Sequence, residues 1–200
     1  MIFVHNPRHR PSGKETVCTR VISELGTDYS PSYVVFDYTG NSSLEELRDL
    51  AFTWNPGDLI LAEPLFLKEL MSRSDCEGII WLSARVIDFP EHLFAWIVAH
   101  EARHLYQFKK NLDCRANRNL VGSLRRRPEF VTMPPTLFGL SELDAEVSAL
   151  KALRSLYGVE AADEFLTQTS LPRGPFPIYN RFLKEAEAQW IESQTDRGPE

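Results

Sequence analysis

Four short apolar runs in the first 85 residues set the strongest limit on how this chain can fold. They are rich in β-branched and aromatic residues, as strands are, and helical patterns separate them. The runs are IFV at 2–4, YVVF at 33–36, LILA at 59–62 and GIIWL at 78–82. We therefore expect a small mixed β-sheet with helices in this part of the chain.

Three helices are expected between these strands. Paired Ser and Glu residues three positions apart are typical of helix starts, and a glycine is typical of a helix end. The expected helices are one from Ser12 and Glu15 to Gly26, one from Ser43 and Glu46 through Leu47, Leu50, Ala51 and Trp54, and one from Pro64 through Met71.

The rest of the chain is expected to be helical. Asp88 and Glu91 can cap a long helix that has Pro90 in its first turn and reaches about Lys110. Residues 111–139 show little periodicity and indicate a long excursion without regular structure. Ser141 with Asp144 can cap the next helix, which Gly158 ends. Two shorter helices, near 159–168 and 178–192, follow, and the tail from Ser193 is expected to fray.

The predicted fold is thus α+β, with one domain over residues 1–192 and a frayed tail over 193–200. A chain of 200 residues with 43% hydrophobic content can bury a sizeable core without disulfides. Cys18, Cys76 and Cys114 form no CxxC pair, so neither a disulfide framework nor a thiolate zinc site is indicated. No secretory signal and no apolar run of about 18 residues is present, so we expect a soluble cytoplasmic protein with no membrane partner.

The segment VAHEARHLYQ in the long helix carries the clearest chemical signal. His100 and His104 are one helical turn apart, so both imidazoles can bind one zinc ion, while Glu101 can hold a water molecule beside it. Zinc lowers the pKa of a bound water and polarises a carbonyl, and a nearby carboxylate can take the proton of that water. The preceding apolar run, LFAWIVA, makes chance a poor explanation, because buried His and Glu need partners.

A catalytic zinc site needs a third protein ligand. No histidine follows His104, and His92 lies too far along the same helix, so a downstream carboxylate is favoured. In LSELDAEVSALKAL we expect Glu142 to be the ligand and Glu146, one turn later, to accept the second ring proton of a ligand histidine. Asp144 and Glu146 remain alternatives for the ligand itself.

HEARH followed by ELDAE resembles the zincin metallopeptidases of gluzincin type, in which a second helix carries the metal-binding Glu and an acidic residue four positions later. The resemblance covers about 20 residues and identifies no subfamily. It implies a zincin-like fold and peptide-bond hydrolysis. Arg103 stands at a usually uncharged motif position, and Glu146 stands where Asp or Asn is more familiar.

Other residues are weaker candidates. Tyr157, Tyr179 and Arg181 could stabilise an oxyanion, but nothing selects one of them, and Gln107 is expected to be solvated rather than to orient a ligand. The net charge of −6 makes nucleic-acid binding unlikely, although a basic stretch from Arg103 to Arg127 should lie near the site.

We therefore expect a zinc-dependent endopeptidase that acts on a protein or peptide, with Glu101 as general base. An extended substrate would add to the edge of the strand near 78–82. The alternative is a non-catalytic binding or regulatory protein on a zincin scaffold, whose structural metal has a fourth protein ligand such as Asp113 or Cys114.

Overall fold

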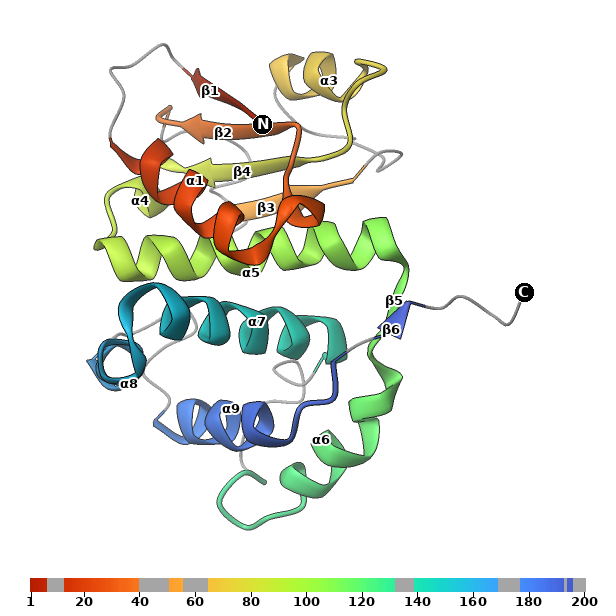
Figure 1. The fold of residues 1–200 in the computed structure, drawn as a ribbon, viewed down its shortest axis with the longest axis vertical. Coiled ribbons are helices and arrows are strands. Elements are labelled where there is room, and N and C mark those ends of the chain that lie inside the picture. Colours follow the sequence, from red (N-terminus) through yellow and green to blue (C-terminus); the bar gives the residue numbers. More distant parts are fainter. Residues whose placement is uncertain are drawn as a thin grey trace.

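The computed structural model describes residues 1–6, 13–39, 51–55, 65–131, 139–168, 177–192 and 194–195 (Figure 1). In chain order the elements are β1 (Ile2–Asn6), α1 (Lys14–Leu25), the 3₁₀ helix η1 (Thr27–Tyr29), β2 (Tyr33–Asp37), β3 (Ala51–Trp54), α3 (Leu65–Met71), β4 (Ile79–Ser83), α4 (Ala84–Ile87), α5 (Glu91–Lys110), β5 (Leu112–Asp113), the 3₁₀ helix η2 (Cys114–Asn117), α6 (Arg118–Arg125), α7 (Leu140–Tyr157), α8 (Val159–Gln168), α9 (Pro177–Gln189) and β6 (Gln194–Thr195).

The main sheet is mixed, and its strands lie in the order β1-β2-β4-β3. β1, β2 and β4 are parallel, whereas β3 runs antiparallel to β4. Every residue of β2 and β4 is buried, which explains their continuous apolar sequences, because both faces of a parallel sheet are covered. The strands expected near 2–4, 33–36 and 78–82 are confirmed, and the run at 59–62 lies outside the described residues.

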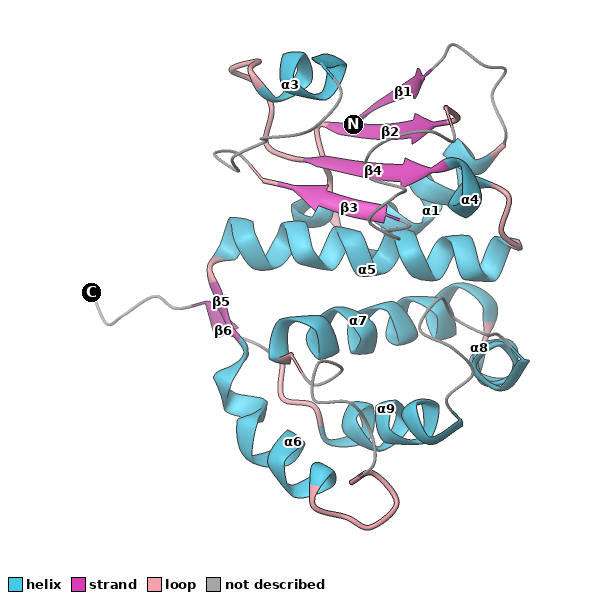
Figure 2. Ribbon diagram, turned by 180° about the vertical axis from the view of Figure 1, so that it is seen from behind, coloured by secondary structure: helices cyan, strands magenta, loops and turns pink. Residues whose placement is uncertain are grey.

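The two faces of the sheet pack against different helices (Figure 2). Val35 and Trp81 lie in a smaller apolar cluster with Leu67 of α3. Val34 and Leu82 point the other way, into a larger core that includes residues of α1, α5, α7 and α9. This alternation is the two-residue period of a strand. The face that carries Val34 and Leu82 packs against α5.

The helix expected through Leu50, Ala51 and Trp54 is wrong where the structure describes it. Residues 51–54 form β3, which pairs with β4 so that Phe52 lies opposite Trp81. The spacing of such a short apolar run fits a helix or a strand, and backbone pairing with β4 decides the outcome. β3 rather than β4 therefore forms this edge of the described sheet, so the expectation that β4 offers an edge to a substrate is also wrong.

α5 is the central layer of the molecule. It lies between the sheet and α7, and α9 packs against the other side of α7 (Figure 1). Eleven of its 20 residues are buried, from Leu93 to Leu105, so its middle is covered on most sides. Within the described residues, α5 and the other helices are too short or too polar to cross a bilayer.

Most predicted helices are confirmed, but their starts differ in detail. Pro90 and Gly139 are the N-cap residues of α5 and α7, and neither end has a capping side-chain hydrogen bond, so the expected caps at Asp88 and Ser141 are wrong. The predicted helix ends are correct. Gly26 and Gly158 adopt positive φ angles of 107° and 89°, which glycine tolerates and which stop the helix.

The segment after α5 is more ordered than its sequence indicated. β5, η2 and α6 occupy residues 112–125, where an irregular excursion was expected. The expected frayed tail also differs in part, because Gln194 and Thr195 pair with β5. The other tail residues lie outside the described part of the chain.

Candidate metal centre

His100 and His104 face one another on the middle of α5. Their Nε2 atoms are 3.0 Å apart, and their ring planes cross at 79°. Two imidazole nitrogens at this distance repel through their lone pairs unless a proton or a cation lies between them. The i, i+4 spacing on one helix face produces the approach.

Glu142, in the first turn of α7, completes a three-residue group. Its Oε2 is 3.5 Å from Nε2 of His100, and its Oε1 is 3.5 Å from Nε2 of His104. Ligand atoms about 2.0 to 2.1 Å from a tetrahedral ion lie about 3.3 Å from one another. The two histidines and Glu142 therefore form a group that could hold a metal ion, as the sequence predicted.

Electrostatics agree with a cation at this point. Hydrogen bonding to His100 and His104 holds the pKa of Glu142 well below its ordinary value. Burial opposes the charged form of His104, but bonding to Glu142 and the charges of Glu101 and Glu142 outweigh it and raise the pKa of His104 to about 9. The group thus favours positive charge between its side chains, and a metal ion would compete with a proton for it.

The two alternative carboxylates of α7 lie elsewhere. Asp144 points away from the histidines and is bound by Arg103. Glu146, predicted to accept the second ring proton of a ligand histidine, is 5% exposed and lies on the Nδ1 side of His100. Its Oε1 is 3.8 Å from Nδ1, which is longer than a hydrogen bond, and its Oε2 has no hydrogen-bond partner among the described residues.

Glu101 is held by the edge strand. Thr53 of β3 contacts it twice, with Oγ1 2.9 Å from its carboxylate Oε2 and 2.7 Å from its backbone oxygen. The single hydroxyl proton can be donated to either oxygen. The carboxylate is thereby placed beside the two histidines without being a member of the ligand group. Thr53 was not anticipated, because its segment was assigned to a helix.

Gln107 is not merely solvated, so that prediction is wrong. Its Oε1 is 2.9 Å from Nδ1 of His104, and its Nε2 donates to the carbonyl oxygen of Ser141 at 2.8 Å and to Oδ2 of Asp144 at 2.9 Å. The side chain therefore links α5 to the start of α7. Its contact with His104, a predicted ligand, agrees with the reading that the sequence alone did not favour.

A cavity of about 430 Å³ contains the group. Three segments supply its walls: β3 with the following residue, α5, and the first turn of α7. The lining residues are Ala51, Phe52, Thr53, Asn55, His100, Glu101, His104, Gln107, Phe108, Ser141 and Glu142. Phe108 is 49% exposed, so the cavity has an apolar, accessible wall one turn beyond His104.

None of the three oxyanion candidates lines this cavity. Tyr157 bonds to Glu91, near the opposite end of α5. Tyr179 is buried in the main core, and Arg181 stacks over a phenylalanine ring. Asn55 is an uncharged polar residue that lines the cavity, but no sequence pattern singled it out.

Ion pairs neutralise much of the basic stretch. Arg103 is buried against Asp144, and the others with acidic partners are Lys109 with Glu77, Lys110 with Asp28, Arg115 with Asp113, and Arg127 with Glu185. No Lys or Arg of this stretch, all of which the structure describes, lines the cavity. The geometry gives no support to the idea that the stretch steers a substrate into the cavity.

A fourth protein ligand is not found among the described residues. Asp113 accepts hydrogen bonds from Arg115, and neither Asp113 nor Cys114 lines the cavity. Cys18, Cys76 and Cys114 form no disulfide, as expected. Within the described part of the chain, the group therefore consists of His100, His104 and Glu142.

Comparison with known proteins adds nothing to this geometry: no family model matches the chain, and no curated protein or solved structure matches it.

Proposed function

We propose that this protein is a zinc-dependent endopeptidase of zincin type. The observation that carries the proposal is the joint placement of His100, His104 and Glu142 as a three-ligand group, with the Glu101 carboxylate in the same cavity. Two imidazole nitrogens and one carboxylate oxygen, with a position left open, are the donor set of catalytic zinc.

A bound zinc ion would supply a water of lowered pKa and would polarise the substrate carbonyl. Glu101 takes a proton from the attacking water as its oxygen bonds to the carbonyl carbon. It then passes that proton to the departing nitrogen as the C–N bond breaks, so the carboxylate is regenerated. The Thr53 hydroxyl, 2.9 Å from Oε2, restricts the orientation of this carboxylate.

The edge strand beside the cavity suggests how a peptide would bind. Ala51, Phe52 and Thr53 line the cavity, and β3 has a described partner on one side only, β4. An extended peptide can add to such an edge by main-chain hydrogen bonds, and its side chains then alternate between pockets and solvent. Phe52 and Phe108 would favour an apolar side chain close to the cleaved bond.

Cleavage of a peptide library tests the proposal. Peptides from a digested proteome are incubated with zinc-loaded protein, with protein stripped by EDTA, and with stripped protein resupplied with zinc. New peptide termini should form in the first and third samples and should be enriched in bulky apolar residues beside the cut. Equal termini in all three samples, or none in any, would contradict the proposal and favour the regulatory scaffold.

A further inference from the structure

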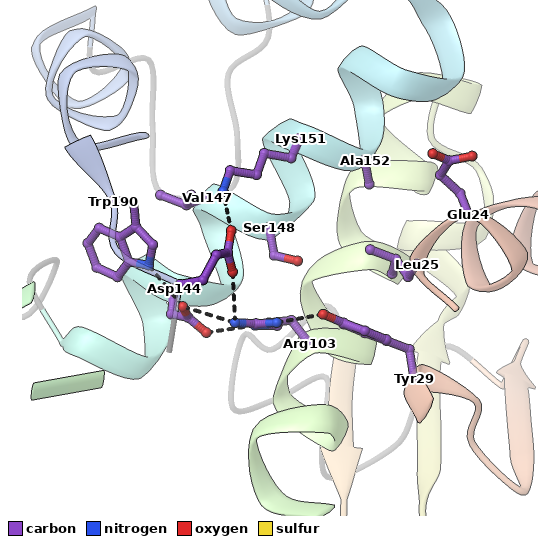
Figure 3. Close-up of a pocket in the computed structure, with 11 residues that line it drawn as sticks. Glu24, Leu25, Tyr29, Arg103, Asp144, Val147, Ser148, Lys151, Ala152 and Trp190 are labelled. Atoms are coloured by element: carbon purple, nitrogen blue, oxygen red, sulfur yellow. Dashed lines mark hydrogen bonds and ion pairs between the residues drawn. The ribbon is translucent and has the colours of Figure 1, made fainter. Parts of the chain in front are cut away.

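The buried carboxylate of Asp144 joins three segments of the chain behind the metal centre. Asp144 is 1% exposed, and its oxygens accept hydrogen bonds from Nε and Nη2 of Arg103 at 2.7 and 3.2 Å and from Nε1 of Trp190 at 2.9 Å. Figure 3 shows these groups in the lining of a pocket, with the Tyr29 hydroxyl beside the guanidinium of Arg103. These three hydrogen bonds restrict the orientation of the carboxylate.

A further hydrogen bond, from Gln107, links Asp144 to His104 of the candidate metal centre. Gln107 places its amide nitrogen 2.8 Å from the Ser141 carbonyl and 2.9 Å from Asp144 Oδ2, and both of these groups only accept hydrogen bonds. The amide nitrogen must therefore face them, and the amide oxygen must face Nδ1 of His104, at 2.9 Å. Nδ1 then carries the hydrogen, which leaves Nε2, the ring nitrogen nearest to Glu142, as the atom that can bind a metal ion.

We propose that Gln107 and Asp144 are positioning residues that fix the ring and the tautomer of His104 for metal binding, and that Trp190 holds Asp144 in place from the C-terminal segment. The inference rests on the proposed metal site. It adds Asp144 and Trp190 to Gln107 as outer contacts of the site. Partners of this kind typically change metal affinity by about 10- to 100-fold when they are removed.

The C-terminal segment that carries Trp190 is itself bonded to the rest of the fold. The side chain of Asn117, which is fully buried, donates to the backbone oxygen of Ile191 at 2.8 Å and accepts from its N–H at 2.9 Å. β6 then pairs with β5, so Trp190 is held to the segment that directly follows α5. Glu192 adds an ion pair with Lys151.

A purely structural role is the competing explanation, since the Arg103–Asp144 pair also joins α5 to α7. The two explanations predict different effects of replacing Gln107: only the positioning role predicts a loss of metal affinity without a loss of folding. Gln107 is only partly buried, so Gln107→Met should leave folding intact while removing the hydrogen bond to His104. Trp190→Phe keeps an aromatic ring but loses the indole N–H that donates to Asp144.

Arg154→Met is the matched control. Arg154 lies on α7 about 18 Å along the helix from Glu142, at 1.5 Å per residue, and pairs with Asp163 and Glu187. Its loss should lower the melting temperature without touching the network around Asp144.

Zinc affinity, measured by competition with a chelating dye, and the visible spectrum of the Co²⁺-loaded protein are the readouts. We expect Gln107→Met to weaken zinc binding by about 10- to 100-fold and to shift the Co²⁺ bands, with a smaller loss in Trp190→Phe and less than about a two-fold change in Arg154→Met. Wild-type affinity and spectrum in Gln107→Met, or an equal loss in Arg154→Met, would overturn the positioning role alone. Absence of zinc binding by the wild-type protein would overturn the proposed function with it.

Discussion

His104 and Glu142 face each other across the contact between α5 and α7, with Nε2 of one 3.5 Å from Oε1 of the other. The two residues are far apart in sequence, and the packing of the two helices brings them together. His100 contacts the same carboxylate through its other oxygen at 3.5 Å. The candidate metal centre is therefore a product of one helix–helix interface.

Replacing the histidines should remove the metal. We expect about one zinc per wild-type chain and essentially none in His100→Ala/His104→Ala, because one carboxylate is an inadequate site. Zinc at 100 times its dissociation constant should add about 2.7 kcal/mol to the unfolding free energy of the wild-type protein only. Elemental analysis and urea unfolding measure both effects, and stoichiometric zinc in the double variant would exclude these residues as ligands.

Glu142 and Glu146 should differ in their effect on zinc affinity. Glu142→Gln replaces an anionic ligand by a neutral amide, so its loss should exceed the about 10- to 100-fold typical of outer partners, whereas Glu146→Gln should stay within that range. Competition with a chelating dye gives both constants. A larger loss in Glu146→Gln would exchange the roles of the two carboxylates.

Asp144→Ala should be strongly destabilising, because it leaves the Arg103 charge buried without its partner. Breaking such a pair typically costs about 3 to 5 kcal/mol, whereas Asp75→Ala, which breaks an exposed pair with Arg73, should cost at most about 1 kcal/mol. Unfolding in urea at neutral pH, on zinc-free protein, compares the two variants. Equal costs would show that the buried pair contributes no more than a surface one.

The Asp144 pair should also give a defined pH dependence. Burial raises the pKa of Asp144, but hydrogen bonds and charge from Arg103 outweigh it, so the pKa lies below its ordinary value. The contribution is therefore fully present above the unfolded pKa of about 3.9 and is lost as the pH falls through the lower folded value. The difference in unfolding free energy between wild type and Asp144→Ala should shrink below about pH 4. A difference that stayed constant down to pH 2 would contradict the assignment.

Local patterns were sufficient to select the three residues of the candidate metal group, because each choice depends on helical spacing. His100 and His104 share one helix face, and Glu142 was chosen as an acid one turn before another acid. Two features could not be predicted in this way. Residues 51–54 form a strand only because β4 is available to pair with them, and Gln107 orients His104 only because Ser141 and Asp144, 34 and 37 residues away, are brought beside it.

The fold, too, has features that local sequence predicts and features that depend on distant contacts. Runs such as YVVF identify buried parallel strands from composition alone, since both faces are covered. The short α6 and the pairing of β5 with β6 depend on contacts with α9 and with the chain end, which no window of sequence contains.

The most direct test of the central claim is the peptide-library assay on Glu101→Gln beside the wild-type protein, both loaded with zinc. Gln keeps the shape of the side chain but cannot take a proton from the attacking water. Zinc content should be unchanged, the unfolding free energy equal or higher, and the rate of peptide cleavage lower by about 10²- to 10⁴-fold, the share of a general base. Cleavage by Glu101→Gln at the wild-type rate would contradict the assigned mechanism even with zinc in place.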